Sequence, residues 1–327
     1  MSKRRVLVLG GTGFIGGHAA RTFAERGDEV SALVRSRARA ERDERLTAVR
    51  LIVGDVAQAS ALLSGERFDV VVYTLGAWTP GERPSRDVVE ARCELVYRRG
   101  LGQVAERARA WGAHLFFLSG VTRFGRRDDL GCFSESTEPG PLDPFGAGKR
   151  SADSLLASID GLRSTSLCPP EVYGAHDPGS HLRFVFERIA ARRFVHLGDG
   201  GARWSLCHVQ NVVDAMVHLA DGDGVGPLLV ADQHPSSQEE IARAVAEAMG
   251  RSSRFVHVPI ALARAIAELN VRLPRPRFLP EPFAPKHVRL RTSDRIFDTR
   301  KARSLGVVPR WSLKQGVVDA VAWWSSR

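Results

Sequence analysis

A glycine-rich turn close to the start of the chain constrains the fold more than any other feature of the sequence. An apolar run from Val6 to Leu9 leads into it, and glycines follow at intervals of three residues, at Gly10, Gly13 and Gly16. Between a strand and a helix, the first two glycines of such a triplet let the backbone turn tightly and approach a pyrophosphate, and the third lets the helix pack on the strand. The N–H groups that begin the helix then face the phosphate charge. The sequence therefore predicts a dinucleotide site whose contacts are Gly10, Thr12, Gly13, Phe14, Ile15 and Gly16.

Apolar segments of strand length alternate with segments of helix length along the N-terminal half. The expected strands are Arg5–Leu9, Glu29–Arg35, Leu51–Val56, Phe68–Thr74, Leu115–Ser119 and Thr165–Leu167. This alternation predicts an α/β fold, a Rossmann-type doubly wound parallel sheet with a smaller, discontinuous C-terminal substrate domain. We expect residues 1–168 with about 205–232 to form the dinucleotide-binding domain, 169–204 with about 233–310 the substrate-binding domain, and 311–327 a C-terminal helix.

Charge and cysteine content narrow the class of partner. The net charge of +10 comes from arginines spread over the whole chain, with no basic block interleaved with aromatic residues, so a nucleic-acid partner is not favoured. No apolar run approaches the roughly 20 residues that a membrane span needs. The four cysteines include no C-x-x-C pair and the histidines no H-E-x-x-H. Neither a disulfide framework nor a metal site is therefore expected, and a cytoplasmic location fits best.

The end of the second expected strand bears on which dinucleotide is bound. An acidic residue there accepts hydrogen bonds from the ribose hydroxyls of NAD, whereas arginine accommodates the 2′-phosphate of NADP. Arg35 ends this strand and Arg39 follows, while the nearest acids come too late in the chain. Asp55, with Val56, ends the third strand and is placed to meet the adenine amino group. NADP(H) is therefore favoured over NAD(H), although arginines placed there by chance would look the same.

Further segments carry a resemblance to a known family. They are Gly54–Val56, Pro144–Lys149, Pro169–Gly174, His208–Ala215 and Phe297–Gly306. With these motifs and the glycine-rich turn, the chain resembles the extended short-chain dehydrogenases/reductases of the NAD(P)-dependent epimerase/dehydratase type over nearly its whole length. The resemblance implies an oxidoreductase that takes a small-molecule substrate. Relatives often pair as homodimers through helices that correspond to about 88–110 and 147–158, and the oligomeric state of this chain stays open. The resemblance also implies cofactor contacts from Leu75, Gly76, Lys149, Pro169 and Val172.

The resemblance weakens where the family carries out its chemistry. Family members use a Ser or Thr, a Tyr that transfers a proton, and a Lys four residues after that Tyr. Lys149 is present, but Phe145 stands at the tyrosine position and Gly120 at the serine position. A positioned general acid or base contributes about 10²–10⁴ in rate, so these losses remove most family-type catalysis unless another group substitutes.

Four side chains are candidates for that substitution. Glu171 follows the sixth strand and would donate a proton if desolvation raised its pKa, or it is an ordinary loop carboxylate. Tyr97 lies where relatives carry a supporting asparagine, and it either reaches the vacated phenol position or packs within its helix. Ser119 and Thr122 flank the Gly120 position.

Three functions stay open from the sequence. The first is an NADP-dependent carbonyl reductase with relocated proton transfer. The second is a catalytically degenerate protein that binds the cofactor and serves as a scaffold or nucleic-acid binder. The third is a non-redox isomerase or cyclase that keeps the cofactor as a structural element. The proline-rich stretch from Leu273 to Pro285 is expected to form the outer wall of the substrate cleft.

Overall fold

The computed structural model describes residues 3–77, 82, 84–125, 131–140, 142–272 and 285–327. Its main feature is a seven-stranded sheet in the order β12-β7-β5-β4-β1-β2-β3, in which every pairing is parallel. The strand order reverses direction beside β1, the arrangement that opens a ligand crevice at the carboxyl ends of the strands. The α/β, doubly wound expectation is confirmed. The strands are β1 (Arg5–Leu9), β2 (Glu29–Val34), β3 (Arg50–Val53), β4 (Val70–Tyr73), β5 (His114–Leu118), β7 (Arg163–Cys168) and β12 (Gly226–Leu229).

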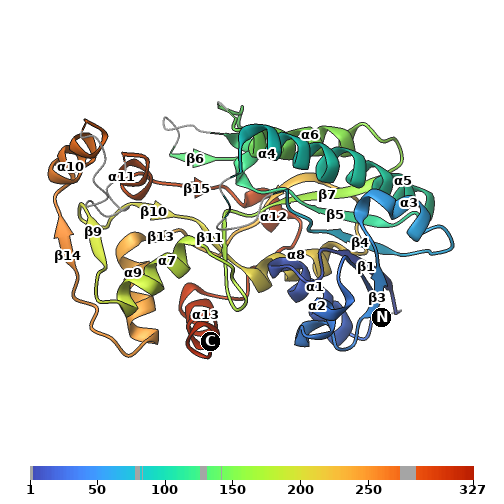
Figure 1. Cartoon of the computed structure of the whole chain (residues 1–327), viewed down its shortest axis with the longest axis horizontal. Helices are drawn as coiled ribbons and strands as arrows, with labels where there is room; N and C mark the ends of the chain where they lie inside the picture. Colours follow the sequence, from blue (N-terminus) through green and yellow to red (C-terminus); the bar gives the residue numbers. More distant parts are fainter. Residues whose placement is uncertain (1–2, 78–81, 83, 126–130, 141, 273–284) are drawn as a thin grey trace.

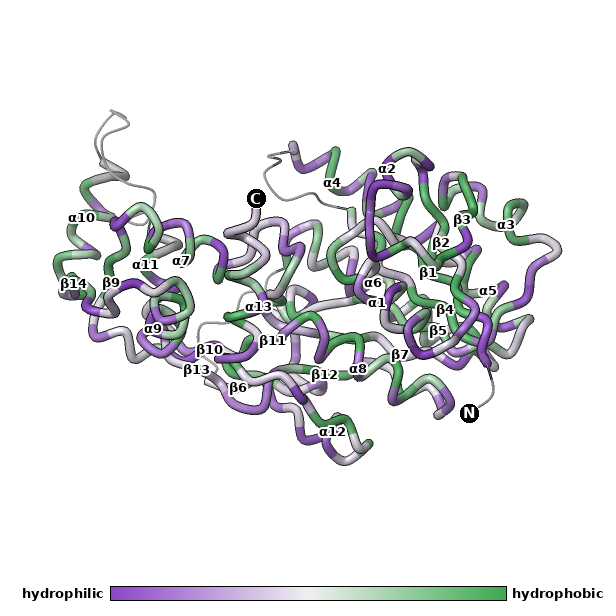
Figure 2. Tube along the Cα trace, turned by 90° about the horizontal axis from the view of Figure 1, so that it is seen from below, coloured by the Kyte–Doolittle hydropathy of each residue, from purple (hydrophilic) through white to green (hydrophobic). Residues whose placement is uncertain are grey.

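Helices cover both faces of this sheet (Figure 1). Side chains alternate along β1, so Val6 and Val8 pack into one apolar layer and Leu7 and Leu9 into the other. Figure 2 shows the resulting hydrophobic strands at the centre of this half of the molecule. Strands buried on both faces explain the continuous apolar runs in the sequence. The first layer contains α1 (Phe14–Glu25) and α8 (Val209–Leu219), and the second contains α3 (Ala59–Leu62), α5 (Leu101–Trp111) and α6 (Pro144–Ala157).

The long helix that precedes β5 is not continuous. Between α4 (Arg86–Cys93) and α5 lies a π-helical segment, Glu94–Gly100. A π-helical turn adds a residue to the helical repeat, and such turns are frequent at functional sites. Tyr97 lies within the segment and its side chain is 1% exposed. The irregularity therefore turns this tyrosine into the interior beside α6.

The remaining elements form a second lobe with an apolar cluster of its own (Figure 1). Two of its helices begin with a capping box, in which a serine and the third helical residue satisfy each other's backbone N–H groups. Its strand pairs are β8 (Glu171–Tyr173) with β11 (Leu206–His208), β9 (Val195–Leu197) with β14 (Val256–Val258), β10 (Arg203–Trp204) with β13 (Ser236–Ser237), and β6 (Cys132–Phe133) with β15 (Ile296–Phe297). Its helices are α7 (His181–Ala190), α9 (Gln238–Ala248), α10 (Ile260–Arg272), α11 (Pro285–Arg291) and α13 (Leu313–Ser325). The short helix α12 (Arg300–Ser304) instead packs against β12, with Ala302 in the first apolar layer of the large sheet.

The structure also bears on membrane crossing and on the proline-rich stretch. No helix in the described ranges combines the length and the apolar character that crossing a membrane requires. Most of the proline-rich stretch expected to wall the cleft, 273–284, lies outside the described residues. The exact domain boundaries stay a prediction.

Candidate functional site

The glycine-rich turn is packed too closely for any side chain. Gly10 has φ +93°, and its carbonyl oxygen accepts a hydrogen bond of 2.8 Å from the N–H of Gly13. A Cβ atom at Gly16 would lie 2.2 Å from that same oxygen and 2.5 Å from the hydroxyl of Thr74. Thr74 is held in turn by a 2.8 Å hydrogen bond to the carbonyl of Leu9. The turn therefore brings the start of α1 against β1, which is the packing that the glycine spacing predicts.

A buried arginine supports the first turns of α1 from outside. A Cβ atom at Gly17 would lie 2.3 Å from the guanidinium carbon of Arg45, which also donates a 3.0 Å hydrogen bond to the carbonyl of Phe14. Arg45 forms an ion pair of 2.7 Å with Asp43. Burial opposes ionisation of Asp43, but hydrogen bonds from Arg45 hold the pKa of that carboxyl below its usual range. Arg45 was not predicted from the sequence. The one available signal was Gly17, because a second glycine beside Gly16 indicates that another group packs closely against the helix there.

The adenosine end carries exposed arginines. Arg35 follows β2 directly, and Ser36 caps the short helix α2 (Arg37–Glu41) by accepting a 3.3 Å hydrogen bond from the N–H of Arg39. Both arginine side chains are exposed. At the end of β3, Asp55 accepts a 2.9 Å hydrogen bond from the N–H of Ala57, and Val56 is buried. Near the end of β4, Leu75 packs in the second apolar layer and Gly76 is exposed.

Lys149, on α6, is buried, and three aromatic rings lie close to its ammonium group. Its Nζ is 4.4 Å from the ring centre of Tyr97, 4.8 Å from that of Phe117 and 5.7 Å from that of Phe145, and it donates a hydrogen bond to the carbonyl of Leu118. Desolvation lowers the pKa of Lys149 to about 7. The family's lysine is therefore present, but Phe145, one helical turn earlier, has a hydrocarbon ring with no proton to transfer.

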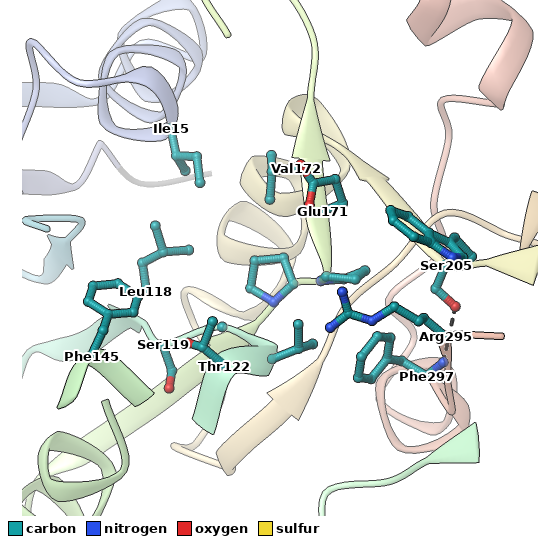
Figure 3. A pocket seen from close by; sticks show the side chains of 15 residues that line it. Ile15, Leu118, Ser119, Thr122, Phe145, Glu171, Val172, Ser205, Arg295 and Phe297 are labelled. Carbon is teal, nitrogen blue, oxygen red and sulfur yellow. Dashed lines mark hydrogen bonds between the residues drawn. The ribbon is translucent and has the colours of Figure 1, made fainter. Parts of the chain in front are cut away.

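Ser119 is committed to a buried ion pair. Its hydroxyl donates a 3.1 Å hydrogen bond to Asp153, whose carboxylate also pairs with Arg123 at 2.5 Å. Figure 3 shows the Ser119 oxygen turned away from the centre of the pocket. Sequence reasoning found neither Arg123 nor Asp153, because their pairing joins α6 to the turn after β5.

A cavity of about 290 Å³ lies where the two lobes meet (Figure 3). Ile15, Leu118 and Phe145 line one end, beside the glycine-rich turn, and Arg295 and Phe297 line the other. Its remaining lining residues are Ser119, Gly120, Val121, Thr122, Pro169, Pro170, Glu171, Val172, Trp204 and Ser205. The structure thus brings together, around one cavity, Ile15, Ser119, Thr122, Pro169, Glu171 and Val172 from the predicted site.

The other three residues that the sequence offers in place of the missing hydroxyls are Glu171, Thr122 and Tyr97, and they are placed differently. Glu171 lines the cavity, and its Oε1 accepts a 2.7 Å hydrogen bond from the N–H of His181. Burial raises the pKa of Glu171, and nearby Asp177 adds to the effect. Thr122 also lines the cavity. The hydroxyl of Tyr97 instead accepts a 3.1 Å hydrogen bond from the N–H of Ala77, and burial raises the pKa of this phenol.

An arginine from a distant segment reaches the cavity. Arg295 follows α11 in the chain, and its guanidinium lies 5.7 Å from the ring centre of Trp204 and extends toward the middle of the cavity in Figure 3. Arg203, which precedes Trp204 in the sequence, is exposed and donates a 3.0 Å hydrogen bond to the carbonyl of Pro235. No local motif marked Arg295, since only tertiary folding brings it next to β10.

The NAD dependent epimerase/dehydratase family model matches residues 6–227, a range that contains the turn, Lys149 and Glu171. The chain belongs to this family. It is 27% identical over 324 residues to the 4-hydroxy-2-methyl-3-oxo-4-farnesyl-3,4-dihydroquinoline-1-oxide ketoreductase of Stigmatella aurantiaca, covering 96% of this chain and 94% of that protein. It is 30% identical over 250 residues to a 3-diazoavenalumate denitrifying reductase of a Streptomyces species, covering 71% of this chain and 77% of that protein.

Solved structures of enzymes, an epimerase among them, share the fold. The UDP-glucose 4-epimerase of Thermotoga maritima superimposes with a TM-score of 0.73 at 21% identity, covering 98% of this chain and 99% of that one. The Bordetella bronchiseptica enzyme WbmH, solved in complex with NAD⁺, has a TM-score of 0.74 at 19% identity over 98% of both chains. As an epimerase/dehydratase family member, the protein is of the NAD(P)-dependent extended oxidoreductase/epimerase type. The described residues fit such a cofactor, because the tight turn at Gly10 and the close packing at Gly16 form the backbone arrangement that lets a pyrophosphate approach the start of α1.

Proposed function

We propose that the protein is an NADP(H)-dependent carbonyl reductase acting on a largely apolar small or medium-sized natural product. Glu171, in this proposal, supplies the proton that the family takes from tyrosine. The observation that carries the proposal is the cavity itself. It has Phe145 at the tyrosine position and a carboxyl group of raised pKa in its wall. A raised pKa widens the pH range over which a carboxyl group stays protonated and can act as a general acid.

The chemistry divides between the cofactor and the protein. The bound nicotinamide would supply a hydride to the carbonyl carbon, and the carbonyl oxygen would take up a proton. Oε1 of Glu171 accepts from the N–H of His181, which leaves Oε2 to carry and deliver that proton. Thr122, which lines the same cavity, would donate a hydrogen bond to the substrate oxygen. Lys149, held by the carbonyl of Leu118, would bind the nicotinamide ribose, as in relatives.

The lining of the cavity supports an apolar substrate. Among the described residues, Glu171 and Arg295 are the charged side chains of the lining, and most of the others are apolar. Two relatives have names consistent with this reading: the ketoreductase of Stigmatella aurantiaca acts on a farnesylated quinoline oxide, and a curated relative from Mycolicibacterium neoaurum is a 3-beta-hydroxysteroid dehydrogenase. Arg295, opposite the nicotinamide end, would orient a polar group of such a substrate.

The test is turnover on a panel of lipophilic ketones, followed through the absorbance of NADPH. Glu171→Gln keeps the shape of the side chain and its contact with His181 but removes the acid, so kcat should fall by about 10²–10⁴ while NADPH affinity is unchanged. Because the proton donor must be protonated, wild-type kcat should fall as the pH rises through the raised pKa of Glu171, and the variant should lose that limb. Wild-type turnover with an unaltered pH profile in Glu171→Gln would remove Glu171 from the mechanism.

A second function has an observation of its own in its favour. Phe145 at the tyrosine position and Gly120 at the serine position carry no hydroxyl, and the hydroxyl of the adjacent Ser119 is held by Asp153. These losses are also those of a protein that binds NADPH without redox turnover, as a sensor, scaffold or non-redox isomerase. Tight NADPH binding with no oxidation on any ketone of the panel would favour this second function.

A further inference from the structure

Two histidines and a glutamate converge at the far end of the second lobe, outside the cavity lining. His196 on β9 is the register partner of His257 on β14, so both side chains leave the paired strands at the same level. Their rings are stacked, with centres 4.9 Å apart and planes inclined by 23°. Glu239, in the first turn of α9, points its Oε2 to this pair, 2.8 Å from Nε2 of His196 and 3.8 Å from Nε2 of His257.

The polar atoms of this cluster lack the hydrogen bonds that burial demands. His196 is 1% exposed, yet within the described residues neither of its ring nitrogens has a hydrogen-bond partner. Oε2 of Glu239 likewise has none, although it lies 2.8 Å from His196, because the geometry of that contact is not that of a hydrogen bond. Buried polar groups in native proteins are almost always satisfied, and an exception calls for a missing ligand, ion or water.

The surroundings prepare these atoms to act as ligands. Nδ1 of His257 lies 3.1 Å from the carbonyl of Gly198, and donation to that oxygen leaves Nε2 with its lone pair toward the cluster. Such a carbonyl partner is the usual support of a metal-bound histidine. Burial lowers the pKa of His196 to about 4, so its imidazole is neutral, the form that binds metals. Oε1 of Glu239 is taken by Arg243 at 3.3 Å, which leaves Oε2 as a single ligand atom.

We propose that His196, Glu239 and His257 form a binding site for a transition-metal ion of the zinc class, with water as the fourth ligand. Bonds of about 2.0–2.2 Å in tetrahedral geometry place ligand atoms about 3.4 Å apart. The separations from Oε2 of Glu239, 2.8 and 3.8 Å, bracket this value, and the three ligand atoms lie within 4.8 Å of one another. Two imidazoles and one carboxylate suit Zn²⁺, and the 44% exposed side chain of His257 gives the ion and its water access from solvent.

The proposed ion would join three segments that are distant in the sequence. β9, the start of α9 and β14 meet at this end of the lobe (Figure 1), where β9 and β14 pair over only three residues each. A metal that binds the folded state stabilises it by mass action. The positive charge of Arg291 acts on His196 and would repel a bound cation, so it weakens metal binding at this site. Bound at this point, the ion would cross-link β9, α9 and β14 and stabilise the outer lobe.

The experiment titrates the full-length protein, stripped with a chelator, with Co²⁺ as a visible probe and with Zn²⁺ as competitor. We expect one Co²⁺ per chain, d–d absorption without a thiolate charge-transfer band, displacement by Zn²⁺, and a rise in Tm on adding Zn²⁺. Glu239→Gln and His257→Gln should each weaken Co²⁺ binding by at least about tenfold, since even supporting residues cost that much. His234→Gln, an exposed histidine outside the cluster, is the matched control and should bind as wild type.

Two results would overturn the proposal. One is the absence of stoichiometric Co²⁺ binding by a wild-type protein of normal Tm. The other is binding outside the cluster, seen either as equal affinity in wild type, Glu239→Gln and His257→Gln or as a thiolate band that assigns the bound ion to Cys132. Because His257 and Glu239 are partly exposed, both variants should fold, and comparing their metal-free Tm with that of wild type verifies this.

Discussion

The two ends of the dinucleotide cleft are built under opposite constraints. At the phosphate end, the backbone leaves no choice of residue, because Gly10 has a positive φ and a Cβ at Gly16 would collide with backbone. At the nicotinamide end, Lys149 keeps its position, yet the ring of Phe145 packs against Tyr97 with centres 6.0 Å apart, and a hydroxyl is dispensable for that packing. We therefore expect cofactor binding to depend on backbone geometry that accepts no other residue at these positions. The proposed proton transfer depends instead on a single side chain, whose role another residue of the cavity can take over.

The largest expected effect is at the phosphate end of the cleft. Gly16→Val should displace the turn, because its Cβ would approach the oxygen of Gly10 to 2.2 Å. Losing two charge-assisted hydrogen bonds to phosphate, at about 1.5–3 kcal/mol each, lowers NADPH affinity by about 10²-fold or more. Overpacking should also reduce the free energy of unfolding by about 1–3 kcal/mol. Fluorescence titration and chemical denaturation measure the two effects.

Gly65→Ala is the matched control for that experiment. Nothing lies within 4 Å of a Cβ at this position, and its backbone is not in the left-handed region. NADPH affinity and stability should both stay at wild-type values. If Gly16→Val also binds NADPH normally, the turn does not hold the phosphates and the contrast between the two ends fails.

The same contrast explains what could be predicted from the sequence. The doubly wound parallel sheet and the glycine-rich turn could be predicted from the local spacing of residues. Each glycine or apolar residue that carries the pattern has its effect within its own strand–turn–helix unit. Arg295, Asp153 and the cluster around His196 escaped prediction because their partners come from segments far along the chain. The π-helical turn at Tyr97 escaped it as well, because one extra residue hardly alters an apolar repeat over a helix of this length.

The next largest expected effect is at the nicotinamide end, where Phe145→Tyr restores the family's phenol. Phe145 lines the cavity with Lys149 close by, so Phe145→Tyr places a hydroxyl where a cation lowers its pKa. In the Glu171→Gln background, we expect this change to recover turnover by at least about tenfold, since a positioned acid contributes about 10²–10⁴. Single-turnover kinetics with NADPH measures the recovery.

The serine should be left unrestored in that experiment. Gly120 has φ +119°, a conformation that a serine rarely adopts, so Gly120→Ser would strain the loop even though the nearest atoms lie 3.9 Å from a Cβ. Phe145→Leu in the same background is the control, since it alters packing without adding a hydroxyl. Equal turnover with Tyr and Leu at this position would show that the cavity no longer places a phenol productively.

The smallest effect separates the two cofactors at the adenosine end. Arg35 directly follows β2, and Asp43 is engaged by Arg45 at 2.7 Å, so we expect the charge that meets the 2′-position to be positive. Arg35→Ala should weaken NADPH by about tenfold, the loss of one charge-assisted hydrogen bond, and leave NADH nearly unchanged. Arg37→Ala is the control, because Arg37 is exposed and lies 3.7 Å from Glu41 within α2. Titrating both cofactors at low and high salt measures the difference, and an equal loss for NADPH and NADH would mean that Arg35 does not read the 2′-phosphate.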